Sequence, residues 1–326
     1  MKKILLGAMT LGLLTACTND DVYTENLCET SNANAGRRAC PSEEIRRDAL
    51  NSDPTLMERY SSLERATEEY MQNSELGKVL ADGTVEIPVV VNVLYRTNAE
   101  NLSATRIAEQ IAVLNADFSG TNTDASKIPA EFKTVAAGNT KVSFRLAKTV
   151  RKKTNKTRWS ANDAMKRSST GGIDATTPAN YLNIWIVGNM SGILGYATFP
   201  ESAGLWNDGV VLAAPYVGKT GAASPYNLGR TATHEVGHYL NLRHIWGDGN
   251  CATDYVADTP TQQSQNYGKP SYPQYDVCGG VSRSVMFMNY MDYVDDAAMF
   301  MFSAGQKTRM NAVTNSSGAR AGLRLL

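Results

Sequence analysis

All three histidines of this 326-residue chain fall within one short stretch, THEVGHYLNLRH, which spans residues 233–244. His234 and His238 are one helical turn apart, so their imidazoles project from the same helix face about 6 Å apart. Two imidazoles at this spacing can bind the same zinc ion. Glu235 follows the first ligand and points to the flank of the metal, where it can reach a bound water. The spacing predicts metal-assisted hydrolysis with Glu235 as the general base.

His244 is the expected third ligand, but a straight helix could not bring it to the same metal. The chain must turn sharply near Asn241, because Asn tolerates the left-handed conformation better than other residues that carry a Cβ. Three protein ligands leave a fourth zinc position open for water, which is typical of a catalytic site. The alternative is that these are ordinary core or surface histidines. It is less favoured because the extended pattern contains every histidine of the chain.

The segments around this motif predict an α/β (α+β) fold. Helices are expected over 48–76, over 104–118 after Ser103, over 228–240, and from Ser303, where SAGQ fits a capping box with Gln306. Buried or short strands are expected at 85–95, 141–148, 181–187, 193–200 and 209–215. The stretch 193–200 would be the upper-rim edge strand that pairs with an extended substrate, and an ordinary core strand is the alternative.

The N-terminus predicts export. Lys2 and Lys3 precede a short apolar run that ends in LTAC, which resembles a bacterial lipobox with Cys17 as the lipidated residue. An ordinary cleaved signal with an incidental cysteine is the alternative. We therefore expect a signal peptide at 1–17, a prosegment at 18–60 and a catalytic domain at 61–326, whose C-terminal tail is trimmed in some forms. The mature protein would be secreted or an outer-envelope lipoprotein of a bacterium.

Charge and cysteine content narrow the partners. Lys+Arg and Asp+Glu both number 32, so there is no basic excess for nucleic acid, and membrane contact is expected only through a lipid anchor. A monomer that acts on protein or peptide substrates is expected. Outside the cytoplasm disulfides persist, and Cys251 and Cys278 are the natural pair in a loop-rich stretch. Closing that loop would stabilise the fold by roughly 3 to 4 kcal/mol.

The motifs together resemble a known family. HEVGHYLNLRH is similar to the metzincin signature HExxHxxGxxH, with Asn241 in the glycine position, and MNYMDY at 288–293 resembles the metzincin methionine turn, with Met291 beneath the metal. With ADTP at 257–260 and FSAGQKTRM, these residues resemble the pappalysin family of zinc peptidases over roughly residues 85–314. The resemblance implies a twisted, mixed, mostly parallel sheet with a backing helix and an active-site helix. This upper subdomain would end near residue 244, and an irregular lower subdomain would follow at 245–326.

The resemblance also implies several roles outside the zinc motif. Tyr293 would lie near the metal and stabilise the oxyanion, although a core aromatic is an equal alternative. A preference for bonds before Arg or Lys would need an acidic pocket, formed by Asp276 or another carboxylate of the lower subdomain. A structural calcium ion would use Asp254, Asp258 and Thr259, which are hard oxygen ligands. Local turns are the alternative for these last three residues.

The N-terminal segment carries a candidate latency motif. RRACPSEE at 37–44 resembles a family prosegment motif, with Pro41 in the place of a glycine. A Cys40 thiolate could occupy the open zinc position and keep a zymogen inactive, whereas a Cys28–Cys40 disulfide is the competing interpretation. Unlike many relatives, the methionine turn offers no cysteine for a second disulfide. Activation cleavage is expected near one of four arginines: Arg46, Arg47, Arg59 or Arg65.

Three functions are compatible with these patterns. The leading hypothesis is a secreted or surface-tethered zinc endopeptidase made as a zymogen. The first rival is a non-catalytic envelope lipoprotein that uses the same fold for binding, and an intact Glu235 argues against it. The second is a zinc hydrolase with non-peptide substrates, which an edge strand beside the metal helix disfavours.

Overall fold

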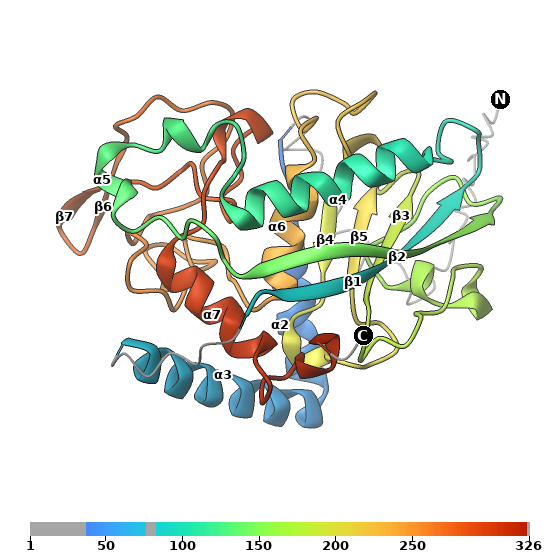
Figure 1. Cartoon of the computed structure of the whole chain (residues 1–326), viewed down its shortest axis with the longest axis horizontal. Coiled ribbons are helices and arrows are strands. Elements are labelled where there is room, and N and C mark those ends of the chain that lie inside the picture. The colour runs from blue at the N-terminus through green and yellow to red at the C-terminus, as the bar shows by residue number, and fades with distance from the viewer. Residues whose placement is uncertain (1–36, 76–82, 325–326) are drawn as a thin grey trace, which may run out of the picture. The chain divides into compact units, whose positions relative to one another are not determined.

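The computed structural model of the chain describes residues 37–75 and 83–324 (Figure 1). The expected signal peptide, Cys17 and Cys28 lie outside these ranges. The described residues belong to one compact unit that begins at Gly36. Within them, no helix combines the length and the apolar character that crossing a membrane requires.

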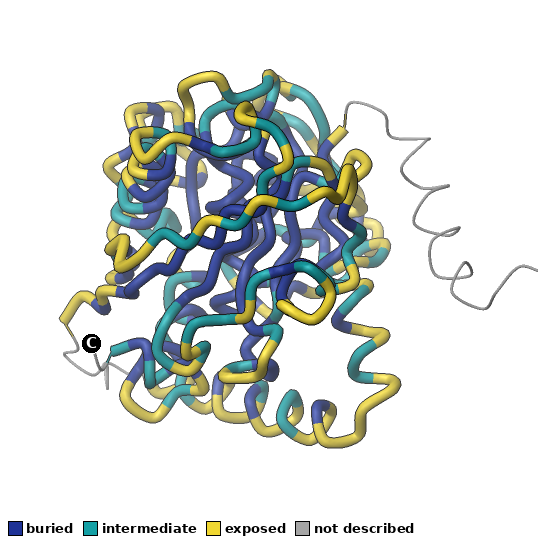
Figure 2. The backbone as a smooth tube through the Cα atoms, turned by 90° about the vertical axis from the view of Figure 1, so that its right-hand side faces the viewer, coloured by how far each residue is buried: buried dark blue, intermediate teal, exposed yellow. Residues whose placement is uncertain are grey.

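A five-stranded sheet forms the centre of the fold. Its order is β2-β1-β3-β5-β4, with β1, β2, β3 and β5 parallel and β4 antiparallel to β5 at one edge. The strands are β1 (Val85–Tyr95), β2 (Val142–Lys153), β3 (Leu182–Val187), β4 (Gly195–Ala197) and β5 (Val210–Ala213). The inner strands are buried, as the dark blue tubes at the centre of Figure 2 show, because their β-branched and apolar residues are covered on both faces. The mixed α/β class predicted from the sequence is confirmed.

Two helices pack between the sheet and the loops. The backing helix α4 (Ala104–Ser119) begins at the N-cap Ser103 and ends at Gly120, which adopts the left-handed conformation. Its apolar face, which includes Ile107, Leu114 and Phe118, is buried. Helix α6 (Arg230–Tyr239) carries the first two histidines, and all of its residues are buried. In Figure 1 it lies behind α4 and reaches towards β4 and β5.

The remaining helices and strands frame this core. They are α2 (Ser42–Ser52), α3 (Pro54–Glu75), α5 (Ala130–Lys133), α7 (Ala304–Thr314), β6 (Tyr275–Cys278) and β7 (Val281–Ser284). Short 3-10 turns occupy Ala125–Lys127, Ala164–Lys166, Ser168–Thr170, Pro200–Ser202, Ala214–Tyr216, Asp296–Ala298 and Ala321–Arg324. The capping box predicted at Ser303 and Gln306 is present at the start of α7.

Two predicted elements differ in detail. The single helix expected over 48–76 is two helices, because Pro54 disfavours helical backbone at Asp53, whose φ and ψ are −126° and 102°. The strand expected over 193–200 is limited to Gly195–Ala197, because a 3-10 turn begins at Pro200. β4 nevertheless lies at the sheet edge, as the rim prediction required.

The N-terminal helices pack on the C-terminal part of the fold. Helices α3 and α7 lie side by side at the bottom of Figure 1, although they are far apart in the sequence. The boundary expected at residue 60 falls inside α3. Residues 37–75 are therefore a structured part of this form of the protein.

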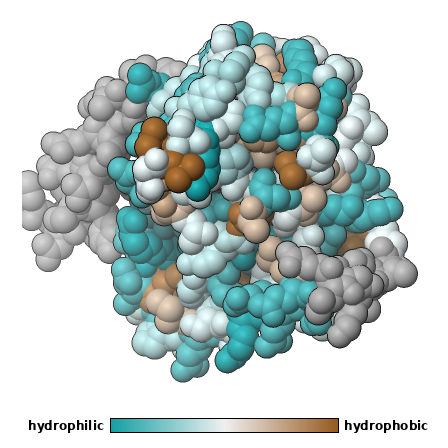
Figure 3. All heavy atoms as spheres, turned by 90° about the vertical axis from the view of Figure 1, so that its left-hand side faces the viewer, coloured by the Kyte–Doolittle hydropathy of each residue, from teal (hydrophilic) through white to brown (hydrophobic). Residues whose placement is uncertain are grey.

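The lower subdomain presents a mixed surface. Figure 3 shows this face, on which brown apolar atoms are scattered among teal and white ones. Val277 and Val281 of the β6–β7 hairpin are half exposed, at 51% and 49%. Isolated apolar side chains of this kind are normal on a protein surface and by themselves indicate no partner.

Candidate active site

The three histidines converge as the sequence predicted. His234 and His238 project from α6, and the chain then reverses at Asn241, which adopts the left-handed conformation with φ of 75°. This turn returns His244 to the other two, so that the ring centroids lie 4.6 Å (His238–His244), 4.8 Å (His234–His238) and 5.2 Å (His234–His244) apart. All three imidazoles are buried.

The outer ring nitrogens are held by the protein. His234 Nδ1 lies 2.7 Å from the Tyr290 carbonyl oxygen, and His238 Nδ1 lies 2.8 Å from the Leu242 carbonyl oxygen. Each carbonyl accepts a hydrogen bond from the Nδ1–H group, which leaves the lone pair on Nε2 and directs it towards the shared centre. Burial lowers the pKa of both imidazoles well below the usual value, so both are neutral, as metal ligands must be.

The inner nitrogens fit a metal ion. His234 Nε2 is buried without a hydrogen-bond partner, and His238 Nε2 lies 3.1 Å from His244 Nε2. His244 Nδ1 is 2.5 Å from Asp248 Oδ1. Burial lowers the pKa of His244, but Asp248 outweighs this effect and the net shift is upwards. Three inward-facing imidazole nitrogens are the donor set that zinc prefers in catalytic sites.

Glu235 stands beside this centre. Its side chain is buried, and burial raises its pKa to about 7, although hydrogen bonds from Cys40 and Ser42 act in the opposite direction. Both neighbours lie 3.2 Å from Glu235 Oε2. A carboxylate with a pKa near neutrality can both accept and release a proton, which is the property a general base needs.

Cys40 lies in the same centre. Its thiol is free and buried. The Sγ atom and one nitrogen of each of the three histidines all lie within 4.8 Å of one another. Burial, together with the charge of Glu235, raises the pKa of the thiol well above its usual value. The latency cysteine predicted from the sequence therefore lies at the histidine cluster, in the arrangement that a thiol blocking a metal site requires.

The segment around Cys40 follows the edge strand. The Leu194 N–H donates to the Ala39 carbonyl oxygen at 3.3 Å, and the Ala197 N–H donates to Ser42 Oγ at 2.9 Å. These contacts flank β4, so the segment occupies the edge that was predicted to bind an extended peptide. It runs in the same direction as β4.

Tyr293 is part of the histidine cluster as well as of the core. Its hydroxyl donates to the Cys40 carbonyl oxygen at 2.8 Å, and its ring lies 4.9 Å from the His244 ring and 5.7 Å from the His234 ring. A hydroxyl that donates to a peptide carbonyl beside the metal ligands has the position expected of an oxyanion-stabilising group.

Met291 lies directly beneath α6. It is fully buried, and a Cβ added at Gly237 would approach its sulfur to 2.4 Å. The Met291 carbonyl oxygen also accepts from the Ile245 N–H, next to His244, at 3.2 Å. Gly237 is therefore needed for the close approach of the helix to the methionine turn, a role that the histidine spacing alone did not reveal.

Of the three residues proposed for calcium, Asp254 and Thr259 are bonded to each other, and Asp258 is bonded elsewhere. Thr259 Oγ1 donates to Asp254 Oδ2 at 2.8 Å, and burial raises the pKa of Asp254 to about 7. Asp258 instead accepts from Ser303 Oγ at 2.6 Å and from the Gly305 N–H at 2.8 Å, at the start of α7. These hydrogen bonds correspond to the local-turn alternative, and calcium at this position stays a prediction.

A buried ion pair connects the N-terminal segment to the start of α6. Arg38 Nη2 donates to Asp296 Oδ1 at 2.6 Å, and both side chains are almost fully buried. Asp296 Oδ2 accepts from the N–H groups of Leu228 and of Arg230, the first residue of the histidine helix. Asp276, the carboxylate that the sequence singled out for specificity, lies on β6 and accepts from the Gln263 N–H. Sequence reasoning named neither Arg38 nor Asp296.

Two further buried arginines hold the end of α6. Arg320 Nε donates to the Tyr239 carbonyl oxygen, and Arg309 Nε donates to the Asn241 carbonyl oxygen, both at 2.7 Å. Arg320 also forms a bidentate pair with Asp208 at 2.8 and 2.9 Å. These donors satisfy carbonyl groups that the helix end leaves without a partner, at the point where the chain turns towards His244.

A disulfide braces the lower subdomain. Cys251 and Cys278 are bonded, as expected, and lie 27 positions apart in the chain. The bridge joins the loop after His244 to strand β6. It therefore restrains the irregular stretch that follows the third histidine.

The fold and the site together define a metalloendopeptidase: an α/β scaffold with three inward-facing imidazoles, an adjacent glutamate and the edge strand β4 close by. Comparison with known proteins gives the family. Residues 171–315 match the family model described as Pregnancy-associated plasma protein-A. Extracellular metalloprotease 1 of Coccidioides posadasii (strain C735) is 32% identical over 296 residues, which cover 86% of this chain and 90% of that protein. The chain belongs to the pappalysin family of zinc metallopeptidases.

Solved structures agree with this assignment. Mature mirolysin of Tannerella forsythia, in complex with a cleaved peptide, is 43% identical with a TM-score of 0.72, and the match covers 75% of this chain and 97% of that one. A mutant of promirolysin from the same organism is 38% identical with a TM-score of 0.80, and the match covers 88% of this chain and 97% of that one. The precursor thus matches a larger share of this chain than the mature enzyme does.

Proposed function

We propose that this metalloendopeptidase is secreted or surface-tethered, is held latent by the segment around Cys40, and cuts peptide bonds before Arg or Lys. The observation that carries the proposal is the cluster of three imidazoles and Glu235 beside the edge strand β4, with a peptide segment of the same chain lying across it. The binding-only alternative is not favoured, because a module that only binds needs no general base at position 235.

The chain's own residues supply most of the reaction. His234, His238 and His244 would hold a zinc ion, which when bound supplies Lewis-acid activation of water and of the scissile carbonyl. Glu235 takes a proton from the attacking water and delivers it to the leaving amine, and its position beside the histidine cluster suits both transfers. Backbone groups flanking β4 would align the extended substrate, and the Tyr293 hydroxyl would donate to the carbonyl oxygen as negative charge develops.

Latency would depend on direct occupation of this site. The Cys40 side chain would take the position of the reacting water, while its carbonyl oxygen accepts from the Tyr293 hydroxyl. Ser42 Oγ donates to Glu235 and accepts from a backbone N–H of β4. The competing Cys28–Cys40 disulfide is less well supported, since Cys40 is free. Removal of the segment would open the site to water and to substrate.

The position of the activation cleavage follows from the helices. The four arginines proposed as cleavage sites all lie in α2 or α3, and Arg46 is buried in an ion pair with Glu201. A helix must open locally before a protease can bind it, so cuts within α2 and α3 are disfavoured. We therefore extend the prosegment beyond residue 60, at least to the end of α3 at Glu75. The smaller share of this chain that mature mirolysin covers supports this extension.

The preference for basic residues is best explained by Asp296. The prosegment already inserts a guanidinium, that of Arg38, against this buried carboxylate, two residues before Cys40. A substrate arginine or lysine could take the same position once the prosegment leaves, and its charge would be paired in a dry site. Asp276 would then have no part in specificity.

Export and calcium complete the proposal. Relatives with the printed name extracellular metalloprotease support secretion, and the lipobox at Leu14 to Cys17 supports a surface tether. A calcium ion at Asp254, Asp258 and Thr259 would require these side chains to exchange their present hydrogen bonds for metal contacts. An increase in melting temperature with added calcium, abolished in Asp254→Asn, would support that site.

A peptide-library digest tests the central claim. Processed protein loaded with zinc is incubated with a complex peptide mixture, with and without a chelator, and the new termini are identified by mass spectrometry. We expect chelator-sensitive cuts that precede Arg or Lys, and no cuts by the Glu235→Gln variant. Absence of any peptide cleavage by the processed, zinc-loaded protein would refute the peptidase assignment, and cuts without a basic preference would refute the specificity alone.

A further inference from the structure

The N-terminal segment carries a second buried arginine besides Arg38. This residue, Arg46, contacts the protein just after the Ala197 end of the edge strand β4. Arg46 Nε donates to Glu201 Oε1 at 2.7 Å, and Arg46 Nη2 lies 3.4 Å from Glu201 Oε2. The same guanidinium lies 4.1 Å from the centroid of the Phe199 ring. Phe199 and Glu201 are both buried, at 1% and 2% exposure. An aromatic face together with a two-oxygen acceptor is the arrangement that a planar guanidinium recognises.

The two arginine positions lie on opposite sides of the catalytic glutamate. Arg38 adjoins Ala39, which is bonded to Leu194 just before β4. Phe199 and Glu201 follow the end of β4 at Ala197. Cys40, in contact with Glu235, comes between the two arginines in the chain. A peptide that lies along this edge therefore meets one buried carboxylate on each side of the reacting bond.

The Phe199 position belongs to the active site rather than to a remote surface. The Phe199 ring centroid is 5.1 Å from that of His238, a proposed metal ligand. The Phe199 ring is therefore in direct contact with one of the side chains that would bind the metal. A peptide that continues past the Ala197 end of β4 would therefore bring a side chain close to this position.

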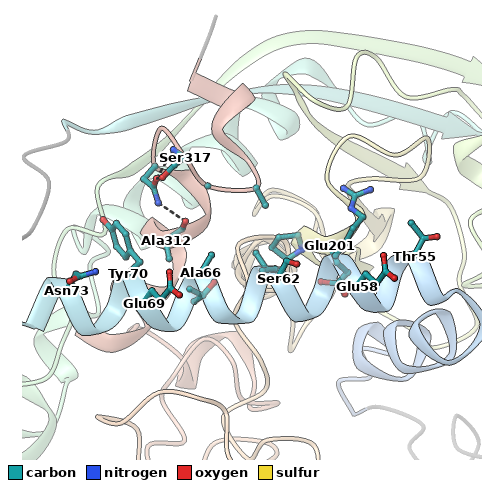
Figure 4. A pocket seen from close by; sticks show the side chains of 17 residues that line it. Thr55, Glu58, Ser62, Ala66, Glu69, Tyr70, Asn73, Glu201, Ala312 and Ser317 are labelled. Atoms are coloured by element: carbon teal, nitrogen blue, oxygen red, sulfur yellow. Dashed lines mark hydrogen bonds between the residues drawn. The ribbon is translucent and has the colours of Figure 1, made fainter.

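Removal of the prosegment would leave Glu201 without its partner. Glu201 also borders a cavity of about 760 Å³ between α3 and the turn that follows α7. Figure 4 shows Glu201 above α3, which carries Glu58 and Ser62. Arg320 lies within electrostatic reach of Glu201 but is already bonded to Asp208 at 2.8 and 2.9 Å. A buried carboxylate that loses its ion-pair partner is unfavourable, so the exposed position would attract another cation.

We propose that Phe199 and Glu201 form a second substrate pocket, which binds an arginine side chain on the amino-terminal side of the scissile bond. The proposal rests on the proposed function, because the side is defined by Asp296 binding the basic residue that follows the bond. The enzyme would then favour peptides with two basic residues that flank the cut. Arginine should bind better than lysine, since only a guanidinium can both stack on the ring and contact two carboxylate oxygens.

A substitution series in the substrate tests this pocket. Peptides share one sequence with Arg directly after the scissile bond, and each of the four preceding positions carries in turn Arg, Lys or the neutral isostere citrulline. We measure kcat/KM with the processed, zinc-loaded enzyme. A desolvated, charge-assisted hydrogen bond predicts that Arg exceeds citrulline by about tenfold or more at one position only. Lys should give an intermediate value at that position.

Two variants assign the effect to its residue. In Glu201→Gln the ratio of kcat/KM for the Arg peptide to that for the citrulline peptide should fall to about one. Glu86→Gln is the matched control, because it removes the same charge from an exposed strand position paired only with Arg145. A second measurement needs no variant: a synthetic peptide of residues 37–52 should inhibit the processed enzyme less when residue 46 is citrulline.

The outcomes separate this proposal from the one on which it rests. Cleavage before Arg with no preference at any preceding position, and equal inhibition by the two 37–52 peptides, would overturn the second pocket and leave the peptidase assignment intact. A preference that persists unchanged in Glu201→Gln would also overturn it. If no peptide in the series is cut, the peptidase assignment itself fails, and the pocket fails with it.

Discussion

Arg320 offers a sharp test of how the histidine helix is held. The residue lies beyond the last position matched by the family model, in a tail that the sequence suggested could be trimmed. Yet its side chain is 2% exposed, donates to the Tyr239 carbonyl oxygen, pairs with Asp208 through two hydrogen bonds, and lies 3.4 Å from the Tyr239 ring centroid. Arg320→Ala would leave the Asp208 carboxylate and the end of α6 without these donors.

The size of the effect follows from burial. Asp208 is 1% exposed, and breaking a buried ion pair by removing one partner costs about 3 to 5 kcal/mol. For a domain of this length, each kcal/mol lowers the melting temperature by roughly 2 to 4 °C, so a decrease of about 10 °C is expected. Arg320→Lys keeps the charge but cannot make all three hydrogen bonds, and we expect about half of that decrease.

Thermal unfolding of the full chain, followed by circular dichroism, measures this loss. Zinc retention against a competing chelator reports separately on the histidine cluster, and it should weaken in Arg320→Ala. Arg145→Ala is the control, because its pair with Glu86 is exposed and such pairs contribute little. A melting temperature within about 2 °C of wild type in Arg320→Ala would refute the reasoning, as would a chain truncated after Asn315 that retains full stability and zinc affinity.

Four further outcomes can be measured on the same protein. Cys40→Ala should process itself faster than the wild-type chain on a gel time course, because the thiol no longer occupies the histidine centre. Asp296→Ala should lower kcat/KM for peptides with Arg after the bond by about 10- to 100-fold relative to peptides with Leu there. Burial raises the pKa of Asp292 from 3.8 to about 6, so the folded state binds more protons between these values. The free energy of unfolding should therefore fall as pH rises from about 4 to about 6, by on the order of 3 kcal/mol in urea titrations, and the fall should disappear in Asp292→Asn. Replacing Cys251 and Cys278 by serine should lower the free energy of unfolding by about 3 to 4 kcal/mol in the same assay.

Local patterns predicted the elements that carry the chemistry. The one-turn spacing of His234 and His238 required a helix, and the six-residue interval to His244 required the reversal that Asn241 provides. Apolar runs predicted the inner strands, and SAGQ predicted the start of α7. Each of these features depends on residues that are close together in the chain, so a short window contains the necessary information.

The contacts that support the site are long-range and left no such pattern. Arg38 and Asp296 are 258 positions apart, and Arg46 and Glu201 are 155 apart. In the sequence each of these arginines looks like any exposed charge of a polar segment. Only the folded sheet edge, along which the segment lies, shows that they are buried. For the same reason the sequence could not choose between Asp276 and the other carboxylates of the lower subdomain, among them Asp296.

The packing of α3 on α7 bears on how activation proceeds. Glu64 is bonded to the buried Arg309 at 2.6 and 2.7 Å, and Arg59 and Tyr60 add contacts to Ala203 and Arg243. These contacts do not depend on the peptide bond that activation cuts. A severed prosegment would therefore remain as a separate inhibitory chain until it dissociates, and rebinding would follow the law of mass action. Full activity would then need dilution or degradation of the released fragment, so the onset of proteolysis would depend on the concentration of the enzyme.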